Sequence, residues 1–146
     1  MSVWVKVCGL RTATEVAAAV EAGADAIGFV FAPSVRRVTP AEASAAAAAA
    51  PAHVRKVAVF LHPSQSELDA VFAGFTPDLV QTDAGDFAAL RLPAGIGCLP
   101  VVRAGVAASG PVGGSMQSMA LLVEGPRSGA GEVADWAAAA RLAAEH

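Results

Sequence analysis

The chain has 146 residues, of which 55% are hydrophobic and 16% are charged, and its formal net charge is −3. This length suits one domain, and the absence of a basic patch with interleaved aromatic residues argues against nucleic acid as a partner. The longest uncharged run, 104–123, is interrupted by glycines, serines and a proline, unlike the ~20 mainly apolar residues of a membrane span. No secretory signal opens the chain, so we expect a cytoplasmic protein that binds a small molecule.

Two cysteines, Cys8 and Cys98, lie far apart in the sequence, each at the end of an apolar run. Together with the missing signal segment, this predicts free thiols in a reducing compartment. No pair of cysteines or histidines has the spacing of metal ligands, so we expect no bound metal ion.

Strand-like and helix-like segments alternate along the chain. Short apolar runs predict strands, and alanine-rich segments of longer period predict helices. The strands are expected at 3–7, 26–31, 56–61, 79–82, 98–103 and 119–124. The helices are expected at 14–22, 40–50, 65–73 and 132–144, with a short helical segment around 87–90.

Several of these helices carry sequence signals at their ends. Thr12 or Thr14 is expected to cap the first helix, and Gly23 to end it. Thr39 with Glu42, and Ser64 with Glu67, have the spacing of a capping box.

The six predicted strands are apolar on both faces, which indicates a parallel sheet covered by helices on both sides. Two architectures fit, an open doubly wound sheet and a (β/α) barrel. A barrel brings the carboxyl ends of all its strands to one site, whereas an open sheet uses only its switch point. Polar residues follow every predicted strand, which favours the barrel-type α/β fold; they are Cys8, Arg37, His62, Asp83, Arg103 and Glu124.

The segment 5–10 places Lys6 and Cys8 at the end of the first predicted strand. Side chains two residues apart in a strand share a face. A thiol beside a cation is a candidate base or nucleophile, although the same pattern is common at an ordinary buried strand end.

The segments 6–10, 22–31 and 34–38 resemble the phosphoribosylanthranilate isomerase family. Further similar segments at 57–60, 79–81, 121–124, 129–131 and 135–136 follow in the family's order. The resemblance covers essentially the whole chain. It implies a (β/α)₈ barrel that acts in tryptophan biosynthesis on a small phosphorylated substrate, without metal or cofactor.

The resemblance also implies roles for individual residues. Cys8 is the expected general base, and Glu124 the expected general acid, at a position where the family has an aspartate. Arg37 is expected to face the anthranilate carboxylate. The other expected substrate-binding residues are Lys6, Gln81, Asp83, Gly129 and Gly131. A simpler interpretation makes His62 an ordinary loop side chain and Asp83 a helix cap.

The chain departs from the family pattern in three respects. Asp83 stands in place of a histidine and Glu132 in place of a lysine. About six of the usual eight βα units are present, so we expect residues 1–146 to form one barrel-like domain without the last two units. Exposed strand edges invite pairing, so we expect a homo-oligomer or a second subunit that completes the sheet. The alternatives are a non-catalytic binding or assembly protein on a degenerate isomerase scaffold, and another phosphosugar isomerase or epimerase.

Overall fold

A computed structural model describes residues 3–103, 120–127, 131 and 133–145. Within these residues, no helix is both long and apolar enough to cross a membrane. The elements in chain order are β1 (Lys6–Cys8), α1 (Ala13–Glu21), β2 (Ala26–Val30), α2 (Pro40–Ala47), β3 (Arg55–Val59), α3 (Gln65–Phe72), β4 (Leu79–Asp83), the 3₁₀ helix η1 (Ala84–Ala88), β5 (Gly97–Arg103), β6 (Leu122–Glu124) and α4 (Trp136–Glu145).

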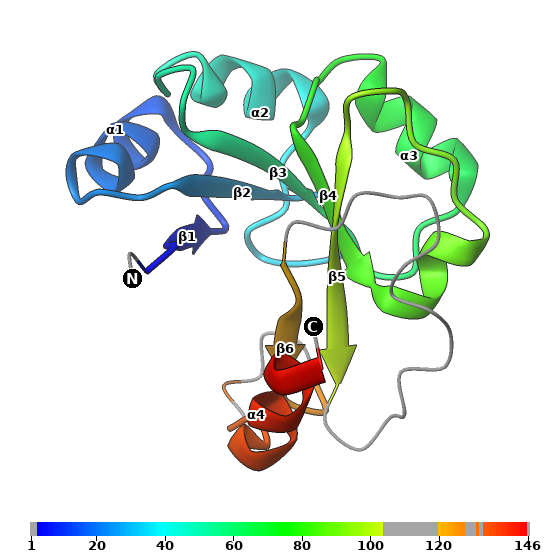
Figure 1. Ribbon diagram of the computed structural model, residues 1–146. Coiled ribbons are helices and arrows are strands. Elements are labelled where there is room, and N and C mark those ends of the chain that lie inside the picture. Colours follow the sequence, from blue (N-terminus) through cyan, green and yellow to red (C-terminus); the bar gives the residue numbers. More distant parts are fainter. Residues whose placement is uncertain (1–2, 104–119, 128–130, 132, 146) are drawn as a thin grey trace.

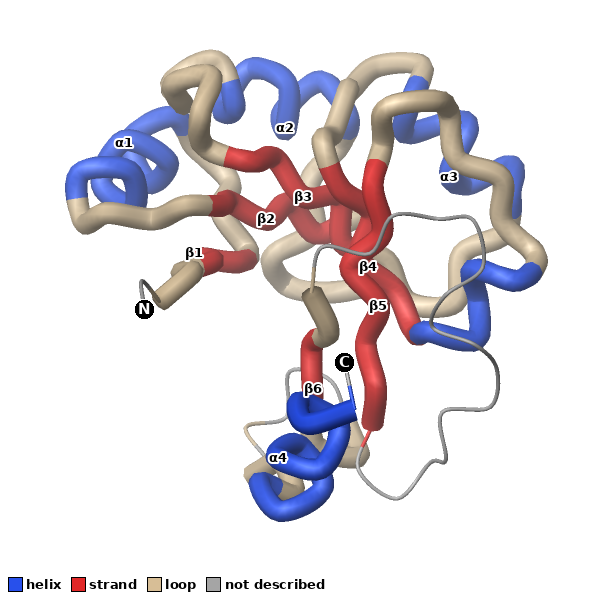
Figure 2. The backbone as a smooth tube through the Cα atoms, viewed as in Figure 1, coloured by secondary structure: helices blue, strands red, loops and turns tan. Residues whose placement is uncertain are grey.

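The described strands form one parallel sheet in the order β1-β2-β3-β4-β5-β6. A doubly wound sheet reverses its strand order at a switch point, so this consecutive order excludes the open-sheet alternative. The sheet curls, and α1, α2 and α3 follow one another along its outer side (Figures 1 and 2). The predicted barrel-type α/β fold is confirmed as a curled half-barrel of six parallel strands.

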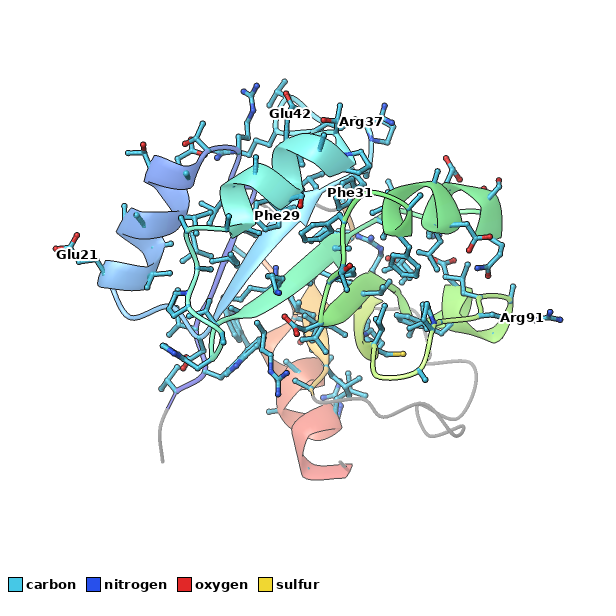
Figure 3. The ribbon with its side chains drawn as sticks, turned by 90° about the horizontal axis from the view of Figure 1, so that it is seen from above. Glu21, Phe29, Phe31, Arg37, Glu42 and Arg91 are labelled. Carbon is cyan, nitrogen blue, oxygen red and sulfur yellow. The ribbon has the colours of Figure 1, made fainter. Side chains whose placement is uncertain are left out.

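The sheet separates two layers of apolar side chains. On the helix side, Phe29 and Phe31 pack in a large cluster that includes Val16 of α1 and Leu68 of α3, and both rings lie close to α2 (Figure 3). The inner face carries a smaller cluster of strand residues, namely Ala26, Val57, Leu79 and Leu99. Because side chains alternate along a strand, every second residue points outward and packs against the helices. The residues between them point to the inner face, where there is room for polar side chains beside the smaller apolar cluster.

Three helices begin with a full capping box. The predicted boxes of Thr39 with Glu42 and of Ser64 with Glu67 are confirmed, and Thr12 forms a third with Glu15. Gly23 ends α1 as predicted. Its φ of +88° is a conformation that glycine adopts without strain, and the N–H groups of Gly23 and Ala24 donate to carbonyls of the last turn.

Several element boundaries differ from the prediction. The first strand starts at Lys6 instead of residue 3, because the N–H of Val5 donates to the Asp25 carboxylate (2.7 Å) and not to a neighbouring strand. The last helix starts at Trp136 instead of residue 132, since Asp135 accepts the N–H groups of Ala137 and Ala138 in the manner of an N-cap. The sixth strand begins at Leu122; residue 119 lies outside the described residues.

Candidate active site

Polar side chains end four of the strands. Cys8 is the last residue of β1, Asp83 of β4, Arg103 of β5 and Glu124 of β6. Arg103 lies directly opposite Glu124 in the β5–β6 register. The carboxyl ends of parallel strands in a barrel lie at one edge, where the active sites of such folds occur.

Cys8 and Lys6 lie together against Gly28 of β2. A Cβ atom on Gly28 would be 2.9 Å from Cys8 Sγ and 3.4 Å from Lys6 Nζ. The Gly28 carbonyl accepts the N–H groups of Gly9 (2.9 Å) and Leu10 (3.2 Å), which fixes the turn after Cys8. The thiol of Cys8 is exposed, so β1 presents an accessible sulfur with an ammonium on the same face.

Two arginines follow β2 and point to different places. The Arg36 stem crosses the turn after Cys8, because a Cβ atom on Gly9 would be only 2.7 Å from Arg36 Cδ. Arg37 lies on the helix side, near α2 (Figure 3). The hydrogen bonds from Ser64 are the main cause of the lowered pKa of Glu67 in the first turn of α3, and the charge of Arg37 lowers it further. Arg36 is thus the arginine that contacts the cysteine loop, while the role predicted for Arg37 stays a prediction.

Arg103 joins two of the expected site residues. Its Nε donates to Asp83 Oδ2 (3.0 Å) and its Nη2 to Oδ1 (2.7 Å), a bidentate pair. Its Nη1 is 3.7 Å from Glu124 Oε2. The hydrogen bonds to Asp83 are the largest of the interactions that raise the pKa of the Arg103 guanidinium. Asp83 makes no side-chain cap to η1, so the interpretation of Asp83 as a helix cap is wrong.

His62 belongs to a second polar chain beside this one. Its Nδ1 is 3.0 Å from Asp86 Oδ1, and the buried Thr82 hydroxyl donates to Asp86 Oδ2 (2.6 Å). Its Nε2 is 3.6 Å from Asp83 Oδ2. The hydrogen bond to Asp86 is the main cause that raises the pKa of His62. His62 is therefore part of a connected cluster, which corrects its interpretation as an ordinary loop side chain.

Gln81 lies on the inner face, between Val59 and Leu99 in the register of the sheet. It is 5% exposed, and its buried Oε1 accepts no hydrogen bond from any residue that the structure describes. An unsatisfied buried amide oxygen is costly, so a donor at this position would be a favourable partner.

The remaining expected positions carry less information. Gly131 adopts a φ of +71° between β6 and α4, and Gly129 lies outside the described residues. Among the described residues, no group of three or more His, Cys, Asp or Glu could hold a metal ion. Cys98 is buried, and burial raises the pKa of its thiol to about 11.

The fold and these strand-end residues define a (β/α) barrel-type protein with a candidate site at the carboxyl edge of the sheet. The family model for N-(5'-phosphoribosyl)anthranilate (PRA) isomerase matches residues 5–145. The chain belongs to the PRA isomerase family.

A curated relative is the N-(5'-phosphoribosyl)anthranilate isomerase of Streptococcus pneumoniae (strain ATCC 700669 / Spain 23F-1). It is 45% identical over 132 residues, which cover 90% of this chain and 65% of the relative. This chain thus spans less than two thirds of the length of that relative.

Solved structures of the same family are similar in fold. Phosphoribosyl anthranilate isomerase from Thermus thermophilus matches with a TM-score of 0.76 and 27% identity over 97% of this chain and 72% of that one. An isomerase in complex with reduced 1-(o-carboxyphenylamino)-1-deoxyribulose 5-phosphate matches with a TM-score of 0.58 and 28% identity, covering 70% and 54% of the two chains. Monomers of the dimeric isomerase of Thermotoga maritima give a TM-score of 0.57, 27% identity, and 70% and 53% coverage.

The sequence did not single out Arg36, Thr82 or Asp86 as site residues. The position of Arg36 depends on a contact between two loops, and that of Asp86 on a side chain 24 residues away. Arg103 and His62 were visible only as members of the polar series at the strand ends. The polar series at the strand ends was therefore the sequence signal that indicated the site, because Asp83, Arg103, Glu124 and His62 all belong to it.

Proposed function

We propose that this chain is a phosphoribosylanthranilate isomerase of tryptophan biosynthesis. The enzyme rearranges phosphoribosylanthranilate into the carboxyphenylamino-deoxyribulose phosphate. The observation that carries the proposal is the family match over 5–145, in which a thiol ends β1 and a carboxyl ends β6. A cytoplasmic location is part of the proposal.

The reaction is an Amadori rearrangement, and Cys8 and Glu124 supply its first two proton transfers. Glu124 protonates the ring oxygen, the bond between that oxygen and the anomeric carbon breaks, and the nitrogen lone pair forms a Schiff base. Cys8 then removes the proton from the adjacent sugar carbon, which gives an enolamine. The Lys6 ammonium, on the same face as Cys8, stabilises the thiolate that this step requires.

Other residues bind the substrate in this proposal. Arg36 or Arg37 binds the anthranilate carboxylate, for which a planar guanidinium is suited; the contact of Arg36 with Gly9 supports Arg36. Gln81 accepts a substrate N–H or O–H at its unpartnered Oε1. Three further residues are expected to contact the sugar phosphate. They are Asp83, which acts together with Arg103, and the glycines Gly129 and Gly131.

The loss of substrate fluorescence on incubation with the chain tests the proposal. We expect Cys8→Ala to lower kcat at least a hundredfold, because removing a general base typically costs this much. Cys98→Ser is the matched control: its thiol is buried on the opposite side of the sheet from Cys8, so turnover should persist. A wild-type chain without turnover, or Cys8→Ala with unchanged turnover, contradicts the assignment.

Self-association is the second part of the proposal. Among the described strands, β1 and β6 are the outer members of the sheet, each paired on one side. Large apolar side chains are exposed in the chain segments that precede β1 and follow β6, including Val3 and Trp4 before β1, and Val133 and Trp136 after β6. Exposed edges beside apolar surface favour pairing with a second chain, and the isomerase of Thermotoga maritima is described as dimeric.

A further inference from the structure

The loop after β3 holds His62 in an unusual backbone conformation. His62 has a φ of 47°, the only positive value among the described residues other than glycine. Such a conformation costs energy for a side chain with a Cβ atom and persists where its surroundings enforce it. At His62 the imidazole ring contacts the carboxylate of Asp86.

Asp86 and Thr82 determine which ring nitrogen of His62 is available. Asp86 approaches Nδ1 with both oxygens, at 3.0 and 3.2 Å. An ionised carboxylate only accepts hydrogen bonds, so Nδ1 carries the proton and Nε2 is the atom that gains or loses one. The fully buried Thr82 hydroxyl donates a hydrogen bond to the Asp86 carboxylate and so helps to fix its position. A histidine oriented by a carboxylate in this way is a common arrangement of general bases.

Nε2 lies beside the strand-end residues of the candidate active site. It is 3.6 Å from Asp83 Oδ2, too far for a hydrogen bond, and both oxygens of Asp83 are bound by Arg103. The His62 side chain is 61% exposed. Nε2 is thus accessible to a substrate at the carboxyl edge of β3 and β4.

The charges around the ring favour proton uptake. Asp86 of η1 and Asp83 of β4 raise the pKa of His62, whereas Arg103 of β5 and partial burial lower it, and the net direction is upward. The imidazole is accordingly a stronger base than an isolated histidine, and it becomes neutral as the pH rises through its raised pKa.

We propose that His62, oriented by Asp86, is a third proton-transfer residue of the active site and accepts the sugar hydroxyl proton in the last step of the rearrangement. The enolamine left by Cys8 still has to become a ketone. Neutral His62 Nε2 takes the hydroxyl proton, and the electrons of that O–H bond form the carbonyl. The enolamine double bond takes a proton at the anomeric carbon from the Cys8 thiol. The substrate thus gains two protons and loses two, and solvent exchange returns His62 and Glu124 to their starting states.

This inference rests on the proposed isomerase function, and kinetics on the whole chain separate the two. His62→Asn is the informative variant because asparagine tolerates a positive φ. We expect it to lower kcat at least tenfold with little change in KM, and to change the acidic limb of the kcat profile against pH. Asp86→Asn should move that limb to lower pH, since Asp86 is the main cause of the raised pKa. His53→Asn, an exposed histidine before β3, should behave as the wild type.

A chemical rescue distinguishes proton transfer from a structural role. His62→Gly leaves space for an imidazole and removes the backbone strain, so added imidazole should restore part of its kcat. A wild-type pH profile in His62→Asn overturns the inference while the isomerase assignment stands. Lost activity with an unchanged acidic limb and no rescue also overturns it, since the role would then be structural. A wild-type chain without turnover contradicts the proposed function itself, and His62 then has no such reaction to serve.

Discussion

At the scale of single residues, the site is organised by close contacts between side chains of neighbouring strands. Gly28 leaves room for the thiol of Cys8 and the ammonium of Lys6, and Arg103 binds Asp83 while it approaches Glu124. Every contact joins adjacent strands or the loops that follow them. The chemistry of the site therefore depends on the register of the sheet as much as on the identity of its residues.

Gly28→Ala tests this dependence. The new Cβ atom would lie 2.9 Å from Cys8 Sγ, so the sulfur must move, and displacements of about 1 Å cost on the order of a hundredfold in rate. We expect kcat to fall at least tenfold, and the free energy of unfolding to fall by about 1–3 kcal/mol from overpacking. Steady-state kinetics and urea unfolding measure the two effects.

Gly85→Ala is the control for this substitution. A Cβ atom there would have no neighbour within 4 Å among the described residues, so both quantities should stay close to the wild-type values. Equal kinetics for Gly28→Ala and the wild type would show that Cys8 tolerates displacement.

At the scale of elements, the helices depend on their first turns. Each of α1, α2 and α3 begins with a hydroxyl residue that accepts the N–H of a glutamate three residues later. Loss of such an N-cap costs about 1 kcal/mol. We expect Thr39→Ala to lower the free energy of unfolding by about this amount, as measured by urea denaturation at pH 7.

The glutamates of these boxes predict an acid dependence of stability. The Thr39 N–H donates to Glu42 (2.7 Å) and lowers the pKa of that carboxyl below its ordinary value of 4.5. A carboxyl whose pKa is lowered by folding stabilises the protein above its unfolded pKa, and this contribution is lost as the pH falls through the folded value. Glu42→Gln should therefore be less stable than the wild type at pH 7, with a difference that shrinks below pH 4.5.

Glu21→Gln provides the comparison. Glu21 points away from the last turn of α1 (Figure 3). It is not part of the capping box of α1, which Thr12 forms with Glu15. Glu21→Gln should differ less from the wild type in free energy of unfolding at pH 7 than Glu42→Gln does. A constant difference for Glu42→Gln between pH 7 and pH 3 would contradict the role of its carboxylate.

At the scale of the whole molecule, the described strands form a curl with β1 at one side and β6 at the other (Figure 1). If a second chain covers these edges, charges placed there should prevent it. We expect the wild type to elute as a dimer or larger species in size-exclusion chromatography with light scattering, and Trp4→Glu and Trp136→Glu to shift it towards the monomer.

Val35→Glu is the control for association. Val35 is 93% exposed in the loop after β2 and belongs to neither outer strand. The substitution should leave the association state unchanged. A wild-type chain that elutes as a clean monomer contradicts the proposal of self-association.

Much of the fold could be predicted because its signals are local. The capping boxes, the Gly23 helix end and the apolar strands lie within a few residues of one another, and the polar series after the strands indicated the edge that carries the site. Asp83 shows the limit of such signals: its sequence position suits a cap, but Arg103, 20 residues later, binds both its oxygens. The proximity of His62 to Asp83, where the family pattern has a histidine, likewise depends on how β3 and β4 pair.

The two apolar layers of the sheet have a practical consequence for protein engineering. The rings of Phe29, Phe31 and Phe75 interlock on the helix side, whereas Cys8 and Lys6 lie against Gly28 on the reverse side of the same strand. Variant libraries that change only the aromatic residues on the helix side can thus be screened for heat tolerance, while the residues of the candidate active site stay unchanged. Libraries that change only residues of the inner face can be screened for activity on new substrates, while the outer core stays unchanged.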